Sequence, residues 1–130
     1  MADDPIAPRG ELATRTVAMP RDTNPSGDIF GGWLMSQMDI AGGVSATRRA
    51  RGRVATVAVE GMVFHYPVHV GNVVCCYAEI EKVGRTSMTI RIEAWAMRQD
   101  TGANVRVTEG IYTYVALDQN GKKRPVPPEA

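Results

Sequence analysis

The spacing of hydrophobic positions changes once from that of a strand to that of a helix, and then changes back. Glu11 to Met19 has the pattern of a short strand, which ends at Pro20 because proline cannot donate to a sheet ladder. Trp33 to about Arg49 is the only segment long enough for a substantial helix. Its apolar and small residues form one stripe at helical spacing: Leu34, Met35, Met38, Ala41, Gly42, Ser45 and Ala46. The sequence therefore predicts a strand followed by one amphipathic helix.

Everything after this helix has the pattern of strands. Alternation is clearest where Thr86, Met88 and Ile90 take turns with Ser87 and Thr89. Turn-forming residues divide the segment into four long strands. The expected strands are Val54–Phe64, Asn72–Val83, Arg85–Arg98 and Val105–Leu117. The element order is β-α-β-β-β-β, which predicts an α+β fold with one long central helix and a five-stranded antiparallel sheet.

Strands of this length have consequences for shape and assembly. A sheet of such long strands must twist and curl, so that it can wrap around the helix. One helix covers only one face of the sheet and leaves the edge strands open to pairing. We therefore expect a homo-oligomer.

The chain has 130 residues, the length of one domain. Residues 1–10 carry acidic residues and prolines, and they predict a flexible N-terminal arm. The folded domain is expected to cover residues 11–118. Residues 119–130 contain three prolines and a basic cluster, and they predict a C-terminal tail.

Composition and charge narrow the classes of function. Hydrophobic residues make up 44% of the chain and charged residues 22%, as in ordinary globular proteins. The net charge of +1 argues against a nucleic-acid partner, which calls for a strong basic bias. No apolar run approaches the ~20 residues that span a bilayer, so no membrane role is expected. The adjacent Cys75 and Cys76 would point to opposite faces of a strand, which suits neither a disulfide nor a metal site and predicts free thiols in the cytoplasm.

Asp39 is the sharpest candidate for chemistry. Aspartate is a poor residue for a helix interior, and no other acidic residue lies between Asp28 and Glu60. A solvent-facing or ion-paired aspartate is the simpler interpretation of this residue alone. However, Asp39 shares a helix face with Met35 and Gly42, close to the apolar stripe. A carboxylate near such a surface is either paired or functional.

Two further features lie just before the expected helix. Gly31 and Gly32 would place free backbone N–H groups at a helix start, where an oxyanion can bind, or would simply form a flexible entry turn. Asn24 lies in a turn-rich loop, and its side-chain amide can donate to a carbonyl or position a water.

Other motifs are weaker. The segment DTNPSGD resembles the first half of a calcium loop, but its twelfth position is Trp33 where a bidentate glutamate is required. His65 and His69 are separated by Pro67, which prevents the helix that would aim both at one metal. No G-x-S-x-G elbow occurs, which disfavours a serine nucleophile, and neither cysteine has a histidine partner in the sequence.

A turn between two expected strands is a candidate anion site. Arg85, Thr86 and Ser87 follow Gly84, and their backbone N–H groups, hydroxyls and guanidinium could bind phosphate. An ordinary hairpin with a solvated arginine is the alternative interpretation.

With these residues in view, the chain resembles the YciA-type bacterial acyl-CoA thioesterases, which are relatives of the mammalian cytosolic acyl-CoA hydrolases. The resemblance covers nearly all of residues 14–127. Four segments carry it: MPRDTNPSGDIFGGWLMSQMDIAGG, RVATVAVEGMVFHYPVHVGNVV, KVGRTS and the closing tail. It implies a hotdog fold, a homodimer with one continuous sheet, and a trimer of dimers.

The resemblance also implies a function and a set of site residues. The chain is expected to hydrolyse fatty acyl-CoA of short to medium or broad chain length, with no cofactor and no metal, since CoA is part of the substrate. Asp39 is the implied catalytic carboxylate at the dimer interface, with Asn24 contributed by the partner protomer. Gly31 and Gly32 are expected to polarise the thioester carbonyl. The CoA phosphates are expected at Arg85, Thr86 and Ser87.

Two other functions remain open. A non-catalytic acyl-CoA sensor would keep the glycines and the phosphate turn without needing Asp39. Another hotdog enzyme, such as a dehydratase, would need a histidine near the helix, and none occurs between residues 1 and 64. For a hydrolase one carboxylate is enough, as general base or as nucleophile, because a thiolate is a good leaving group.

Overall fold

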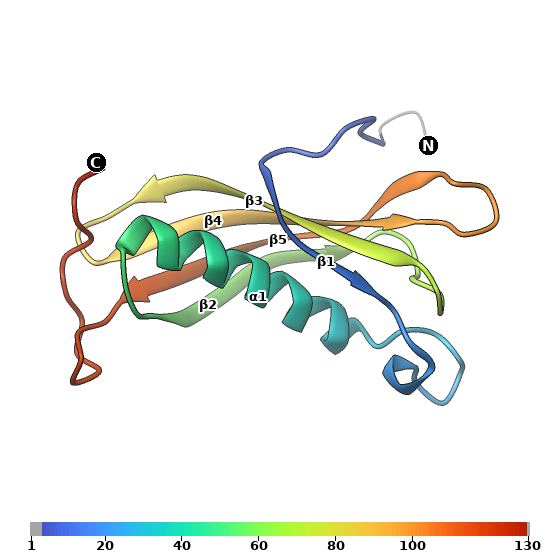
Figure 1. Cartoon of the computed structure of the whole chain (residues 1–130), viewed down its shortest axis with the longest axis horizontal. Coiled ribbons are helices and arrows are strands. Elements are labelled where there is room, and N and C mark those ends of the chain that lie inside the picture. Colours follow the sequence, from blue (N-terminus) through green and yellow to red (C-terminus); the bar gives the residue numbers. More distant parts are fainter. Residues whose placement is uncertain (1–3, 130) are drawn as a thin grey trace.

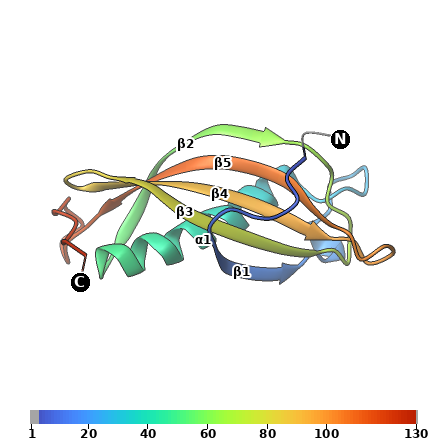
Figure 2. The same ribbon diagram turned by 90° about the horizontal axis from the view of Figure 1, so that it is seen from above.

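The computed structural model describes residues 4–129, which form one curved sheet around one long helix (Figures 1 and 2). The elements are β1 (Glu11–Val17), the 3-10 helix η1 (Pro20–Asp22), α1 (Gly31–Ala50), β2 (Val54–Phe64), β3 (Val73–Val83), β4 (Ser87–Met97) and β5 (Asn104–Ala116). All strand pairs are antiparallel, in the order β1-β3-β4-β5-β2. The predicted α+β class and element order are therefore confirmed.

The start of the helix differs from the prediction. α1 begins at Gly31 rather than at Trp33, so the two glycines lie in the first turn and not before it. The main-chain oxygen of Phe30 accepts hydrogen bonds from the N–H groups of Trp33 (3.1 Å) and Leu34 (3.3 Å), which closes the first turn. The hydrophobic pattern missed this turn because glycine contributes no side chain to an apolar stripe.

The core lies between α1 and the concave face of the sheet. The helix buries five residues of the predicted stripe, Leu34, Met38, Ala41, Gly42 and Ala46, and in addition Ala50. Strands β4 and β5 supply large side chains: Met88, Ile90, Ile92, Tyr112 and Tyr114. Small residues on the helix and large ones on the sheet let α1 lie close to the strands, as Figure 1 shows.

The convex face of the sheet is also covered in its centre. Glu93 and Trp95 are each 1% exposed, although alternation places them on the side away from α1. One carboxylate oxygen of Glu93 accepts from the Arg91 guanidinium (2.6 Å), and the other accepts from Trp95 Nε1 (2.9 Å) and the main-chain N–H of Arg9 (3.3 Å). This buried charge is therefore paired and hydrogen-bonded.

The predicted N-terminal arm contributes to this cover. Residues 1–3 lie outside the described residues, while the carboxylate of Asp4 accepts a hydrogen bond from the Tyr66 hydroxyl (2.6 Å). The Arg9 guanidinium also reaches Glu79 on β3 (2.7 Å). Figure 2 shows this segment crossing the sheet above the strands.

The edge strand β2 is the most exposed element of the sheet. Within residues 4–129 it pairs only with β5, and side chains on both of its faces are exposed, including Val57 (54%) and Phe64 (48%). A long apolar edge with free backbone groups is a template for pairing with another chain. Of the edges that the sequence analysis expected to be open to pairing, β2 therefore offers the longer exposed apolar strand.

Gly42 has a specific packing role in the middle of α1. A Cβ at this position would overlap the hydroxyl oxygen of Tyr114 and would lie 2.5 Å from Ile92 Cδ1. A Cβ at the next residue, Gly43, would have no described atom within 4 Å apart from those of its own stretch of helix. The helix backbone thus lies against side chains of the sheet at Gly42 and not at Gly43.

We predict that Gly42→Ala destabilises the fold by about 2 kcal/mol relative to Gly43→Ala, because overpacking a filled site typically costs 1–3 kcal/mol. Both substitutions gain the same helix propensity, so their difference isolates the contact. The measurement is thermal unfolding of both variants at one protein concentration. Equal melting temperatures would contradict the packing role of Gly42.

Candidate active site

Asp39 lies in the third turn of α1, half-buried, on the side of the helix that faces strands β5 and β2. Its Oδ1 accepts hydrogen bonds from Thr56 Oγ1 (2.7 Å) and Tyr114 Oη (2.9 Å). Thr56 on β2 and Tyr114 on β5 are direct cross-strand partners, so a single strand pair delivers both hydroxyls. The other carboxylate oxygen, Oδ2, has no hydrogen-bond partner among residues 4–129.

The hydrogen-bond partners of Asp39 bear on the interpretations that the sequence left open. Both partners are neutral hydroxyls, and within residues 4–129 no Lys, Arg or His forms an ion pair with this carboxylate. Asp39 therefore does not take part in a surface salt bridge within the described residues, which would have been its simplest structural role. An oriented carboxylate with one free oxygen is suited to taking a proton or attacking an electrophile.

Sequence reasoning missed Thr56 and Tyr114. Tyr112 and Tyr114 alternate along the last strand and both face α1, where a buried phenol hydroxyl needs an acceptor. If the last strand is assumed to pack against the helix, these hydroxyls are expected to donate to main-chain or carboxylate oxygens of α1. Thr56, a hydroxyl residue in an apolar strand, offers no signal of its own.

Asn24 holds the loop between η1 and α1. Its side-chain Oδ1 accepts hydrogen bonds from the main-chain N–H groups of Ser26 (3.0 Å) and Asp28 (3.1 Å). The main-chain N–H of Asn24 donates to the Asp28 carbonyl (2.7 Å). The amide oxygen is therefore used within the loop, whereas the amide nitrogen keeps its donors. No hydrogen bond joins Asn24 to Asp39 within the part of the chain that the structure describes.

Gly31 and Gly32 occupy the first two positions of α1, where backbone N–H groups have no acceptor inside the helix. A Cβ at Gly32 would meet open space, and one at Gly31 would meet only the Phe64 ring at 3.4 Å. No acidic residue lies in this first turn. The helix start can thus accept a negative charge.

The turn between β3 and β4 holds the three candidate phosphate ligands. The N–H of Gly84 donates to the Ser87 carbonyl (2.8 Å), and the carbonyls of Arg85 and Thr86 accept from Val126 (2.8 Å) and Ala116 (2.9 Å). The backbone of the turn is fixed by β5 and the tail, while the Arg85 side chain is exposed. The turn lies at the end of the molecule where α1 finishes, away from Gly31 (Figure 1).

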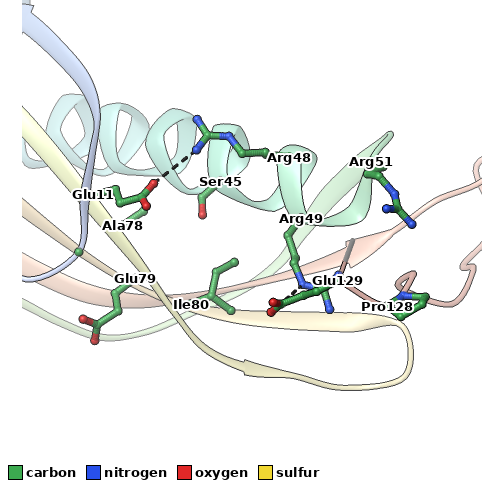
Figure 3. A pocket seen from close by; sticks show the side chains of 11 residues that line it. Glu11, Ser45, Arg48, Arg49, Arg51, Ala78, Glu79, Ile80, Pro128 and Glu129 are labelled. Carbon is green, nitrogen blue, oxygen red and sulfur yellow. Dashed lines mark hydrogen bonds and ion pairs between the residues drawn. The ribbon is translucent and has the colours of Figure 1, made fainter.

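Asp39 does not line the hollow that lies along the C-terminal half of α1. A cavity of about 490 Å³ lies between the C-terminal half of α1, β3 and the tail (Figure 3). Its Arg48 and Arg49 pair with Glu11 (3.4 Å) and Glu129 (3.8 Å), so its charges are largely balanced. A second cavity of about 290 Å³ is lined by Gly31, Leu34 and Phe64 beside the helix start.

The histidines and cysteines that the sequence analysis did not assign to a site have other contacts in the structure. His65 contacts Glu109 on the convex side (2.7 Å). Cys75 and Cys76 are free and buried, and burial raises the pKa of the Cys76 thiol to about 12, which keeps it protonated.

Among the described residues, no cluster of three His, Cys, Asp or Glu side chains could hold a metal ion. No helix within residues 4–129 is both long and apolar enough to cross a membrane.

Comparisons with known proteins agree with this architecture. A family model described as the thioesterase superfamily matches residues 26–103. The acyl-CoA thioester hydrolase YciA of Salmonella typhimurium is 56% identical over 123 residues, which are 92% of this chain and 92% of that protein.

Solved structures match over nearly the whole chain. A hexameric broad-specificity acyl-coenzyme A thioesterase is 50% identical, with a TM-score of 0.89 over 95% of this chain and 85% of that one. A hexameric hotdog-fold thioesterase of Campylobacter jejuni is 40% identical, with a TM-score of 0.87 over 91% of each chain. The expected fold and enzyme class are confirmed: the chain belongs to the thioesterase superfamily, as a hotdog-fold acyl-CoA thioester hydrolase of the YciA type.

Proposed function

We propose that this protein hydrolyses fatty acyl-CoA, of short to medium or broad chain length, at an active site shared by two protomers, with Asp39 as the catalytic carboxylate. The observation that carries the proposal is an Asp39 carboxylate with a free oxygen beside the edge strand β2, whose outer side has no partner strand among residues 4–129. The relatives above act on acyl-CoA, and one of them is described as having broad specificity.

The helix geometry supports a shared site. Gly31 and Asp39 are eight residues apart, which is about 12 Å along an α-helix at 1.5 Å per residue. A reacting carbonyl has to lie within about 3 Å of both its oxyanion donors and the catalytic group. One protomer therefore does not bring both features to one carbonyl, whereas two copies joined side by side can combine Asp39 of one with the helix start of the other.

The exposed surfaces support the same arrangement. Apolar residues are exposed along β2, namely Val57, Val59, Val63 and Phe64. Pairing β2 with β2 of a second copy would continue the sheet and cover this surface. The similar structures are described as hexameric, and we propose a trimer of such dimers, with no nucleic-acid or membrane partner.

The proposed reaction uses a water molecule. Asp39 Oδ2 removes a proton as the water oxygen attacks the thioester carbonyl, and the Asn24 amide of the partner protomer orients that water. The N–H groups of Gly31 and Gly32 at the helix start of that same partner protomer stabilise the negative charge that forms on the carbonyl oxygen. The C–S bond then breaks, the proton passes to the departing CoA sulfur, and the free acid remains.

The rest of the substrate lies farther away. We propose that Arg85, Thr86 and Ser87 bind phosphates of CoA, because the turn has a fixed backbone and an exposed guanidinium. No cofactor or metal is needed in this scheme. The buried free thiols fit a reducing compartment, and we propose that the enzyme acts in the cytoplasm.

We predict that Asp39→Asn lowers kcat for acyl-CoA hydrolysis by about 10²–10⁴-fold, the usual contribution of a general base. The amide oxygen can still accept from Thr56 and Tyr114, so the fold and the oligomer should be unchanged. The measurement is thiol release with size-exclusion chromatography. Asp100→Asn, on an exposed hairpin, is the matched control. Native turnover in Asp39→Asn would refute the assignment, and tight acyl-CoA binding without turnover by the native protein would favour a sensor.

A labelling experiment separates the two roles of the carboxylate. In a single turnover in ¹⁸O-water, a general base leaves Asp39 unlabelled and places the label in the acid product. Direct attack forms a mixed anhydride, and its hydrolysis at the aspartyl carbon places ¹⁸O in Asp39. We expect an unlabelled Asp39 peptide by mass spectrometry, and a labelled peptide would establish the nucleophilic route.

We predict that Arg85→Ala raises KM for acyl-CoA about tenfold, the equivalent of about 1.4 kcal/mol, with little change in kcat. The same variant should hydrolyse the corresponding acyl-pantetheine at the native rate, because that substrate lacks the nucleotide phosphates. Equal effects on both substrates would show that Arg85 acts on the fold and not on phosphate.

A further inference from the structure

We propose that Tyr114 is a positioning residue for catalysis, which reaches the Asp39 carboxylate through the gap left by Gly42 and fixes which oxygen faces the substrate. The inference rests on the proposed role of Asp39. In this proposal Tyr114 contacts neither the water nor the thioester, and it affects the reaction only through the Asp39 carboxylate.

The contacts of Tyr114 are unusual for a core tyrosine. Its hydroxyl lies 2.9 Å from Asp39 Oδ1 and 2.8 Å from the main-chain oxygen of the same residue. One phenolic proton thus has two acceptors on one residue, one charged and one neutral. The contact to the main chain fixes the phenol against the helix, and the contact to Oδ1 fixes the rotation of the carboxyl group.

Two hydroxyls on the same oxygen define the orientation of the carboxylate. Thr56 Oγ1 holds Oδ1 from the edge strand, and Tyr114 holds it from beneath the helix. With Oδ1 occupied twice, Oδ2 is the oxygen left for a water. Catalytic groups lose efficiency steeply when they are misplaced, since a shift of about 1 Å can cost about 10² in rate.

Gly42 makes this contact possible. A side chain at position 42 would occupy the space of the Tyr114 hydroxyl oxygen and would lie 2.8 Å from Tyr114 Cζ. Tyr114 is 1% exposed, so the phenol cannot move out into solvent. The missing side chain of Gly42 therefore allows a buried hydroxyl to reach the helix residue three positions earlier.

Tyr114 is not itself an alternative base. Burial, and next the hydrogen bond to Asp39, raise the pKa of the Tyr114 phenol far above its ordinary value. The phenol therefore stays a neutral donor at any working pH. Its function is confined to donating a hydrogen bond.

The chain offers a matched control two residues earlier on the same strand. Tyr112 is also 1% exposed, its ring stacks on that of Tyr114 (centroids 6.4 Å apart), and its hydroxyl donates to the main-chain oxygen of Met35 (2.8 Å). Both tyrosines thus anchor the helix by the same kind of bond. Only Tyr114 also contacts the carboxylate.

The test compares Tyr114→Phe with Tyr112→Phe. Each variant keeps the ring and loses one buried hydroxyl, so both should have similar melting temperatures and the native oligomer. We expect kcat for a short acyl-CoA to fall about tenfold in Tyr114→Phe with KM within twofold, and to stay within twofold in Tyr112→Phe. Gly42→Ala, which displaces the phenol but keeps its hydroxyl, should also lower kcat.

A double-variant cycle shows whether Tyr114 acts through Asp39. In the Asp39→Asn background, Tyr114→Phe should cause no further loss of the residual rate, because the group that it positions is already inactive. An equal loss in both backgrounds, an unchanged kcat in Tyr114→Phe, or equal losses in both tyrosine variants would overturn the inference. Native activity in Asp39→Asn alone would instead refute the proposed function.

Discussion

The open edge at β2 is the constraint on which the rest of this molecule depends. An eleven-residue strand with apolar side chains on both faces cannot remain alone in water, because its backbone groups and its valines both call for a partner. The same strand supplies Thr56 to Asp39, so the edge that we propose pairs with a second copy also holds the proposed catalytic carboxylate. In the proposed function, assembly and catalysis thus both depend on the edge strand β2.

The helix connects this edge to the core. Its small residues bring the backbone close to the sheet, and this proximity lets the tyrosine hydroxyls of β5 reach main-chain oxygens of α1. A buried hydroxyl without an acceptor would cost about 1–3 kcal/mol, so these bonds also fix the position of the helix along the sheet. The carboxylate of Asp39 is held by the same contacts that hold the helix.

The sequence predicted much of this arrangement, and the limits of the prediction have physical causes. The bounds of β2 were predicted correctly because turn residues flank a stretch rich in valine and alanine, whereas the helix start was missed because Gly31 and Gly32 add nothing to a hydrophobic stripe. Asp39 stood out as an acidic residue in an apolar helix. Its partners could not be found in this way, because Thr56 and Tyr114 meet it only through the strand register.

Neutral donors are better suited than a cation to hold a general base. An arginine bound to the carboxylate would fix its orientation, but the positive charge would also favour the ionised form and weaken its attraction for a proton. Hydroxyl groups give the orientation with a smaller electrostatic effect, and they carry no counter-charge that must be moved when the proton arrives. The phenol of Tyr114 has a second acceptor in the main-chain oxygen of Asp39, so its proton can turn there when the carboxylate becomes neutral. In the proposed mechanism, the phenol therefore keeps a hydrogen-bond acceptor at the moment when Asp39 takes a proton from water.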